Sequence, residues 1–357
     1  MVDHPDFETA KALKRGGLVF AALDGPGIRR RRTAQGFVYE APDRSPLKDV
    51  REIGRIRALA VPPAWREVWI CPRPNGHIQA VGLDARGRRQ YRYHPDFRAL
   101  RDAAKYQHLL TFAEALPALR ARIAADMAKR GLGREKVLAT VAHLLETTLI
   151  RVGNREYAEA NGSYGLTTLK ARQVAVDGGE LRFRFKGKSG REWRLGVTDR
   201  RVANIVRACQ DLPGQPLFQY LDDDGAAQQV SSTDVNDYLR EASGRDITAK
   251  DFRTWAGTVR AATILADAPP PQSDAEAARV LKAAAAEVGR ALGNTPTVCL
   301  KCYIHPEVQD AFRARDLRLT RRARPRHGFT ADEAAVLAFL RRRTASTPGG
   351  RGVAGVR

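Results

Sequence analysis

The stretch LRFRFKGKSGREWRLGV, residues 181–197, decides the fold of the second half of the chain. Apolar and polar residues alternate strictly on both sides of a glycine-containing turn at 186–190, which is typical of two half-buried strands joined as a hairpin. The alternating apolar residues are Leu181, Phe183 and Phe185 before the turn and Trp193, Leu195 and Val197 after it. A further strand is expected over 172–176, followed by Asp-Gly-Gly. The segment therefore predicts a small three-stranded sheet with Lys188 at a hairpin tip.

Helical periodicity dominates the sequence around this sheet. A core-facing stripe with steps of three and four residues precedes it, and its members are Val137, Leu138, Val141, Leu144, Leu145 and Leu149. Thr248-Ala-Lys-Asp251 is a capping-box variant that predicts a helix start before 252–265. An Ala-rich helix is expected from about Ser273 to Gly293, which is well placed as a C′ glycine. Thr295-Pro296 then opens a short helix, with Tyr303 on it or just past its end.

The first hundred residues look β-rich instead. Short alternating segments occur near 27–40, 66–71 and 77–93, with one helix expected over 47–59. The sequence thus predicts an α+β protein with a small β-rich N-terminal domain, a mainly α-helical second domain containing the three-stranded sheet, and a basic, disordered tail. We expect these parts to span 1–100, 101–340 and 341–357.

The composition is strongly basic. Lys and Arg number 61 against 40 Asp and Glu, which gives a net charge of +21 and a pI near 10.4. Much of this charge is clustered, at 29–32, 86–92, 318–326 and 341–343. Such an excess indicates a polyanionic partner, most simply double-stranded DNA.

Hydropathy argues against a membrane or secreted protein. Hydrophobic residues make up 43% of the chain, which is ample for a buried core. No apolar run approaches the roughly 18 residues of a membrane span. The run 18–23 near the N-terminus is too short for a secretory signal. We therefore expect no membrane partner and a cytoplasmic, nucleoid-associated protein.

The segment CLKCYIHP, residues 299–306, raises the question of a metal or redox site. A zinc site would need a second pair of ligands, and Cys71 and Cys209 stand alone in the sequence. The favoured interpretation of Cys299 and Cys302 is two small side chains one helical turn apart. No phosphate-binding loop of the form G-x-x-x-x-G-K-[ST] occurs either. No cofactor and no metal are expected.

The segment GRRQYRYHP, residues 87–95, interleaves basic and aromatic residues. As a strand, it would place Gln90, Arg92 and His94 on one face and Arg89, Tyr91 and Tyr93 on the other. Arginine suits phosphates, whereas Gln and Tyr suit base edges and sugars, so this is a candidate DNA-facing surface. The alternative is an ordinary polar edge strand.

Breaking a DNA phosphodiester without metal or ATP needs three kinds of group. These are a nucleophile that keeps the bond energy in a covalent link, cations on the non-bridging oxygens, and an acid for the leaving alkoxide. The chain offers one candidate set in order: Arg151 at a helix end, Lys188 at the hairpin tip, Arg253 in a capped helix, Asn294, and Tyr303 nine residues later.

This ordered set resembles the type IB DNA topoisomerases, specifically their small poxvirus-like bacterial branch. The motifs that carry the resemblance span about 20–340: RRQYRY (88–93), RVGNREY (151–157), GLTTLKARQV (165–174), FKGKSGREW (185–193), TAKDFRTW (248–255) and LGNTPTVCLKCYIHP (292–306). One departure is Asn294, which stands where poxvirus-type enzymes have a histidine.

The resemblance implies a monomeric enzyme that relaxes positive and negative supercoils without ATP or metal. Tyr303 would attack DNA to form a 3′-phosphotyrosyl link, Arg151 and Arg253 would hold the scissile phosphate, and Lys188 would protonate the 5′ oxygen. Asn294, in place of the histidine, can donate one neutral hydrogen bond to a phosphate oxygen but does not titrate. The N-terminal β domain would close over DNA. The expected DNA contacts are Arg88, Arg89, Gln90, Tyr91, Tyr93, Tyr157 and Lys250.

Two alternatives stay open on the sequence alone. A tyrosine recombinase uses the same chemistry, but usually has a histidine three residues before the second arginine, where this chain has Lys250, and has a helical N-terminal arm domain. A non-enzymatic chromosome-binding protein would fit the basic composition equally well. It has no need for the ordered Arg, Lys, Arg and Tyr set.

Overall fold

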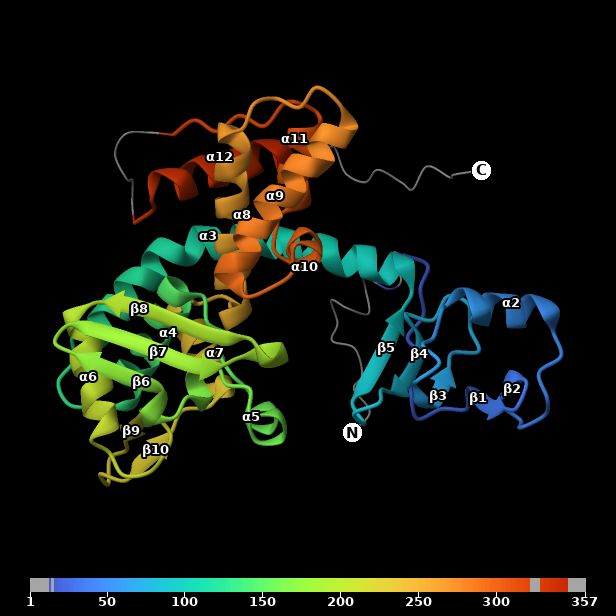
Figure 1. Cartoon of the computed structure of the whole chain (residues 1–357), viewed down its shortest axis with the longest axis horizontal. Coiled ribbons are helices and arrows are strands. Elements are labelled where there is room, and N and C mark those ends of the chain that lie inside the picture. The colour runs from blue at the N-terminus through green and yellow to red at the C-terminus, as the bar shows by residue number, and fades with distance from the viewer. Residues whose placement is uncertain (1–12, 14–15, 322–327, 346–357) are drawn as a thin grey trace. The chain divides into compact units, whose positions relative to one another are not determined.

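The structure is a computed structural model that describes residues 13, 16–321 and 328–345 (Figure 1). By their internal contacts the residues form two compact units, which divide between Gln107 and His108. The division falls inside one long helix, α3 (Pro95–Met127), seven residues beyond the boundary expected at residue 100.

Unit 1 contains a five-stranded antiparallel sheet. Its strand order is β2-β1-β3-β4-β5. The strands are β1 (Ile28–Thr33), β2 (Gly36–Glu40), β3 (Arg66–Ile70), β4 (Ile78–Leu83) and β5 (Arg89–Tyr93). One helix, α2 (Val50–Ala58), begins at Asp49, whose carboxylate accepts from the backbone N–H of Arg51. The β-rich prediction for this region is confirmed.

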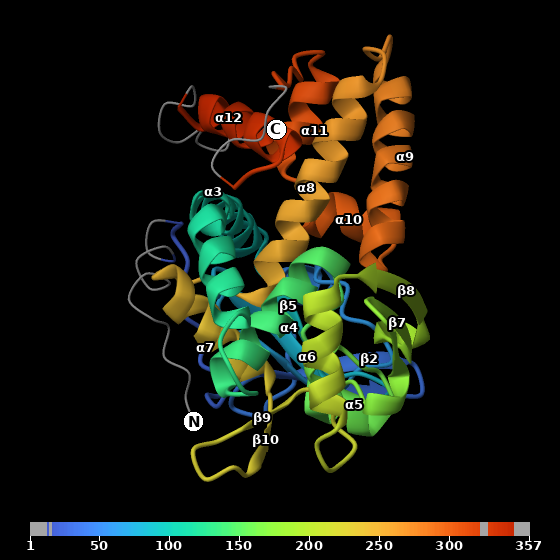
Figure 2. The same cartoon turned by 90° about the vertical axis from the view of Figure 1, so that its left-hand side faces the viewer.

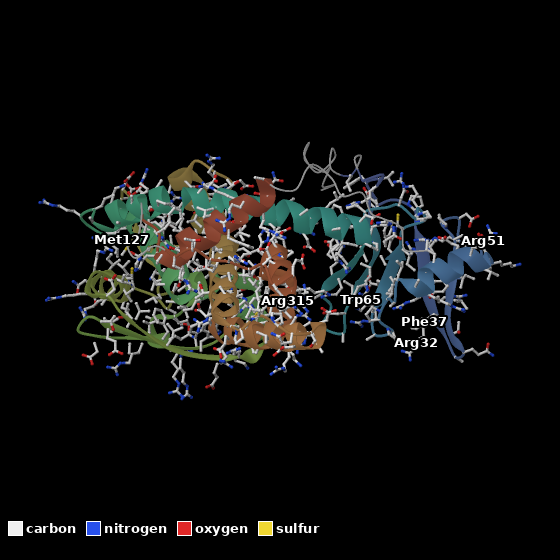
Figure 3. All side chains as sticks on the ribbon, turned by 90° about the horizontal axis from the view of Figure 1, so that it is seen from above. Arg32, Phe37, Arg51, Trp65, Met127 and Arg315 are labelled. Carbon is white, nitrogen blue, oxygen red and sulfur yellow. The ribbon has the colours of Figure 1, made fainter. Side chains whose placement is uncertain are left out.

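A small apolar core holds α2 against the sheet. Its buried members are Ile28, Ile56, Val68, Ile70 and Ala80. Basic side chains lie outside this core, and Figure 3 labels two of them, the exposed Arg32 and Arg51. Unit 1 thus combines a packed interior with a cationic surface.

A buried histidine makes the stability of unit 1 depend on pH. His77 Nδ1 accepts a hydrogen bond from the Ala21 N–H at 3.0 Å, and its ring stacks on Phe20 with centroids 4.9 Å apart. Burial lowers the pKa of His77 below its usual value near 6.5. Below that value the unfolded chain takes up a proton that the folded unit does not bind.

We therefore expect unit 1 to lose stability as the pH falls through about 6.5, until the lowered pKa of folded His77 is reached. Hydrogen exchange of the 18–24 backbone, compared at pH 7.5 and 5.5, measures this for unit 1 alone. The His77→Gln variant, which keeps an acceptor for Ala21, should lose much of the dependence. An unchanged dependence in that variant would contradict the assignment.

Unit 2 is mainly helical. Besides most of α3, its helices are α4 (Arg134–Thr148), α5 (Arg155–Asn161), α6 (Arg200–Gln210), α7 (Ser232–Ser243), α8 (Ala249–Asp267), α9 (Asp274–Leu292), α10 (Pro296–Cys302), α11 (Pro306–Arg313) and α12 (Ala331–Ala345). Helix α8 begins with the predicted capping box, in which the Thr248 N–H donates to the Asp251 carboxylate at 2.8 Å. Helices α8 and α9 lie side by side, as Figures 1 and 2 show.

The three-stranded sheet has the order β6-β7-β8. Its strands are β6 (Val174–Asp177), β7 (Glu180–Lys186) and β8 (Glu192–Thr198). The hairpin register pairs Phe183 with Leu195 and Phe185 with Trp193, as the alternation predicts. The first strand was expected over 172–176, but it begins only at Val174. Ala171–Gln173 forms a 3₁₀ turn instead, in which the Lys170 N–H donates a hydrogen bond to the Gln173 side-chain oxygen at 2.8 Å.

The C-terminal region corrects the predicted tail. Helix α12 continues to Ala345, so residues 341–345 are helical. Two arginines fix this end of the helix: Arg341 pairs with Glu114 at 2.7 Å and Arg343 with Glu307 at 2.9 Å. The rest of the expected tail, 346–357, lies outside the described residues, as does 322–327 of the basic cluster. In the part of the chain that the structure describes, no helix is long and apolar enough to cross a membrane.

Candidate active site

Arg253 joins the C-terminal ends of two helices. From the second turn of α8, its Nη1 donates to the carbonyl of Leu149, the cap of α4, and its Nη2 donates to the carbonyl of Leu292 at 2.6 Å, the end of α9. The last carbonyls of a helix lack intrahelical donors and carry partial negative charge. Arg253 satisfies both ends, which explains how a guanidinium can be only 3% exposed.

Arg151 and Asn294 each lie two residues beyond one of these helix ends. They meet there, because Arg151 Nη2 donates to Asn294 Oδ1 at 2.6 Å. Arg151 was expected to end the helix itself. Helix α4 instead stops at Thr148, since Leu149 adopts a left-handed conformation with φ 56°. The loop that follows is held by a hydrogen bond from the Leu166 N–H to the Arg151 carbonyl at 2.9 Å.

Tyr303 caps α10, as the sequence predicts. Its N–H donates to the Cys299 carbonyl at 2.9 Å. Thr258, fully buried on α8, donates its hydroxyl to the Tyr303 carbonyl and accepts from the His305 N–H, both at 3.2 Å. The backbone on both sides of the phenol is therefore fixed to α8. The phenol ring lies near Arg253, whose Cζ is 5.3 Å from the ring centroid.

The surroundings of Tyr303 favour its charged form. Burial alone would raise the pKa of Tyr303, but the neighbouring Arg253, and Arg151 behind it, outweigh burial and lower it below the usual value near 10. Asn294 is also near enough to contribute, although its Nδ2 makes no hydrogen bond with a described group. Burial, followed by repulsion from Arg151, lowers the pKa of Arg253 in turn.

Two buried donors at this site lack acceptors among the described residues. They are Arg253 Nε and Asn294 Nδ2. A buried donor without a partner costs roughly 1–3 kcal/mol. Beside a cluster of two arginines, an oxyanion such as a phosphodiester is the group that would satisfy both and compensate the charge. The arrangement can therefore hold a phosphate next to a phenol.

Lys188 lies outside this cluster of contacts. It is exposed at the tip of the β7–β8 hairpin, in a 3₁₀ turn over Lys188–Gly190. The hairpin itself approaches the end of α9, where Arg191 Nη2 donates to the Arg290 carbonyl at 3.4 Å. Four of the five predicted catalytic residues thus form one cluster. The fifth, Lys188, lies on a hairpin that is hydrogen-bonded to the end of α9.

The predicted DNA contacts of unit 1 lie on or beside β5. Arg88 pairs with Asp84 at 2.7 Å, and Gln90 donates to the same carboxylate at 3.0 Å. Tyr91 is 38% exposed and stacks on Tyr93 with centroids 5.9 Å apart, which confirms that they share a face. Tyr93, however, also packs against a buried cluster beside α3, so much of its ring belongs to the core.

The remaining predicted contacts are at the surface. Arg89 is exposed on β5. In unit 2, Tyr157 on α5 is 49% exposed, and Lys250 is exposed in the first turn of α8. All three side chains are therefore accessible to a ligand.

The cysteines beside Tyr303 lie on one helix, and neither forms a disulfide. Cys299 is buried and Cys302 is exposed, and burial raises the pKa of Cys299. Their spacing is that of one turn of α10, as the sequence suggests. Over the described ranges, no group of three or more His, Cys, Asp or Glu side chains is arranged to hold a metal ion.

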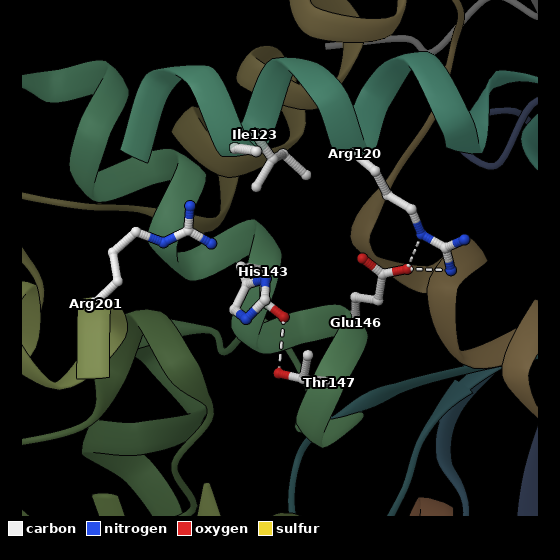
Figure 4. Close-up of a pocket in the computed structure, with 7 residues that line it drawn as sticks. Arg120, Ile123, His143, Glu146, Thr147 and Arg201 are labelled. Atoms are coloured by element: carbon white, nitrogen blue, oxygen red, sulfur yellow. Dashed lines mark hydrogen bonds and ion pairs between the residues drawn. The ribbon is translucent and has the colours of Figure 1, made fainter. Parts of the chain in front are cut away.

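A separate pocket lies between α3, α4 and α6 (Figure 4). It is lined by Arg120, Ile123, Ala124, His143, Glu146, Thr147 and Arg201, and none of the predicted site residues is among them. Arg120 is already bound by Glu146 and Glu333, at 2.6 Å and 2.7 Å. Its guanidinium is therefore committed to the interior of unit 2.

Sequence reasoning missed two residues of the site, Gly257 and Thr258. For Gly257 a signal was available, because it lies four positions after Arg253 and therefore on the same side of α8. A Cβ on Gly257 would lie 2.8 Å from the Tyr303 carbonyl oxygen. The two residues together bring α8 into direct contact with the backbone of Tyr303.

Comparison with known proteins identifies the class. The family described as eukaryotic DNA topoisomerase I, catalytic core, matches residues 94–320, and the bacterial DNA topoisomerase IB N-terminal domain matches residues 36–84. DNA topoisomerase 1B of Acanthamoeba polyphaga mimivirus is 32% identical over 237 residues, which cover 65% of this chain and 70% of that protein.

The chain therefore belongs to the type IB DNA topoisomerases. Its function is that of an isomerase that cleaves and religates DNA, and DNA is its substrate. The matched N-terminal domain is of the bacterial topoisomerase kind, which favours this family over the tyrosine recombinases.

Proposed function

We propose that Tyr303 is the nucleophile of an ATP- and metal-independent reaction that relaxes positive and negative supercoils. The observation that carries this proposal is the cluster of Arg151, Arg253 and Asn294 around a half-buried tyrosine. The lowered pKa of Tyr303 supports it, because a phenolate is the attacking form.

The proposed reaction conserves the phosphodiester energy. The Tyr303 oxygen gives its proton to water and bonds to phosphorus, the bond from phosphorus to the 5′ oxygen breaks, and Lys188 gives its proton to that oxygen. The product is a 3′-phosphotyrosyl link and a free 5′-hydroxyl. Torsion then rotates the cut duplex about the intact strand. The hydroxyl attacks back at high effective concentration, which reseals the strand without fuel.

The donors of the cluster would act on the scissile phosphate. Arg253 Nε and Asn294 Nδ2 are the open positions, and Arg151 adds a second cation. Charge on the non-bridging oxygens is stabilised most by donors that are already in place, and two backbone carbonyls fix Arg253 beforehand.

A covalent trapping experiment tests the assignment. Wild-type protein is incubated in EDTA, without ATP, with a duplex whose cut strand loses its short 5′-hydroxyl fragment, and is then denatured. Peptide mapping should find the DNA on Tyr303 through its 3′ phosphate. A link to any other residue, or to a 5′ phosphate, would overturn the proposed chemistry.

Because asparagine does not titrate, Asn294 should add no ionisation to the pH dependence of the cleavage rate. Asn294→Ala should slow single-turnover cleavage by roughly 10- to 100-fold, since a hydrogen bond to a charged group is lost. The wild-type cleavage rate should rise with pH and level off below about pH 10, without an ionisation of the residue at 294 near 6.5. Asn294→His should introduce one. Full activity of Asn294→Ala would remove the residue from the mechanism.

We further propose that unit 1 supplies the other side of a DNA clamp and that the chain works as a monomer without an obligate protein partner. The accessible Arg89 and Tyr91 on β5, with Tyr157 and Lys250 in unit 2, would contact the duplex. The net charge of +21 predicts affinity that falls steeply with salt. The place of action would be chromosomal DNA in the nucleoid.

A further inference from the structure

The indole of Trp193 lies in a space left by two glycines. A Cβ on Gly187 would be 2.7 Å from its Nε1, and a Cβ on Gly293 would be 2.6 Å from its Cζ2. One end of the ring therefore contacts the residue before Lys188, and the other contacts the residue before Asn294. No larger residue fits either position without moving the ring.

The ring itself is held firmly on the sheet. Trp193 pairs with Phe185 across β7 and β8, and the two rings stack with centroids 6.0 Å apart and planes at 3°. Phe185 is buried. The Gly187 N–H donates a hydrogen bond to the Arg191 carbonyl at 2.8 Å, which closes the turn. Arg191 Nη2 donates to the Arg290 carbonyl. The hairpin tip is thus tied to the end of α9 through Trp193 and Arg191.

The Lys188 side chain is exposed and flexible, so its position depends on how firmly the hairpin tip is held. A general acid must lie within hydrogen-bond reach of the oxygen that it protonates. We infer that Trp193 is a positioning residue, whose indole, wedged between Gly187 and Gly293, sets where the hairpin presents Lys188 relative to Asn294. This inference rests on the proposed role of Lys188.

A change of leaving group tests it. Cleavage is measured under single-turnover conditions on two duplexes with the same mapped cleavage site, one natural and one with sulfur in place of the bridging 5′ oxygen. A thiolate leaves without help, since thiols titrate near pH 8.5. Trp193→Ala should cut the natural duplex about 100-fold more slowly than wild type. It should cut the sulfur duplex at nearly the wild-type rate.

Three variants complete the design. Val197→Ala, on the same strand, is the matched control and should cut both duplexes normally. Trp193→Phe keeps a ring on Phe185 but shortens its reach, so it should show a smaller defect of the same kind. If Trp193→Ala fails to fold, the comparison of the two duplexes is made with Trp193→Phe instead. Lys188→Ala reports on the proposed acid.

The outcomes separate the inference from the proposed function. If sulfur rescues Lys188→Ala but not the Trp193 variants, Trp193 does not act through Lys188 and the inference is wrong. If sulfur fails to rescue Lys188→Ala, Lys188 is not the acid, and its proposed role and the inference fail together, whereas the assignment of Tyr303 as the nucleophile is left to the trapping experiment. Rescue of both supports both.

Discussion

Tyr303→Phe should abolish relaxation of both negatively and positively supercoiled plasmid in EDTA without ATP. The substitution removes only the oxygen that would bond to phosphorus, and the Tyr303 backbone keeps its contacts with Thr258 and Cys299. The variant should therefore fold and bind DNA like wild type, and should form no covalent adduct. Agarose-gel relaxation at catalytic amounts of protein measures the effect.

The matched control is Tyr220→Phe on β9 (Gln219–Leu221), a half-buried tyrosine with no place in the proposed site. It should relax plasmid normally. Relaxation that survives in Tyr303→Phe would mean that the nucleophile is misassigned. Binding without relaxation by wild type would point to the chromosome-binding alternative.

Gly257→Ala should lower the cleavage rate by about 100-fold, because a displacement of the nucleophile by about 1 Å has an effect of this size. The new Cβ would lie 2.8 Å from the Tyr303 carbonyl oxygen and 3.1 Å from its Cβ. The contact is with backbone, so Tyr303 or α8 must move. DNA binding should change little. Single-turnover cleavage and a binding titration separate the two effects.

Gly54→Ala provides the control for helix propensity. Gly54 lies on α2 with open space around the position of a Cβ. Alanine there should stabilise the protein by up to about 1 kcal/mol and leave activity unchanged. If Gly257→Ala behaved in the same way, the close approach of α8 to Tyr303 would not control the reaction.

Local patterns were enough to predict most elements of the fold. The β7–β8 hairpin, the capping box of α8 and the C′ glycine at Gly293 each depend on residues within a few positions of one another. Helix α12 escaped prediction over 341–345. Its arginines are fixed by carboxylates distant in sequence, such as Glu114.

The sequence by itself determined that the chain carries an Arg, Lys, Arg, Asn and Tyr set, that Lys188 lies at a hairpin tip and Arg253 in a capped helix, and that the second domain is helical around a small sheet. Only the tertiary structure decided that Arg253 bridges the ends of α4 and α9. That bridge explains why Arg151 and Asn294 meet beside Tyr303 and why the pKa of the phenol is lowered. The physical reason is that periodicity and capping depend on neighbours along the chain, whereas these contacts join residues near the end of α4 to residues 104 and 143 positions further along the chain.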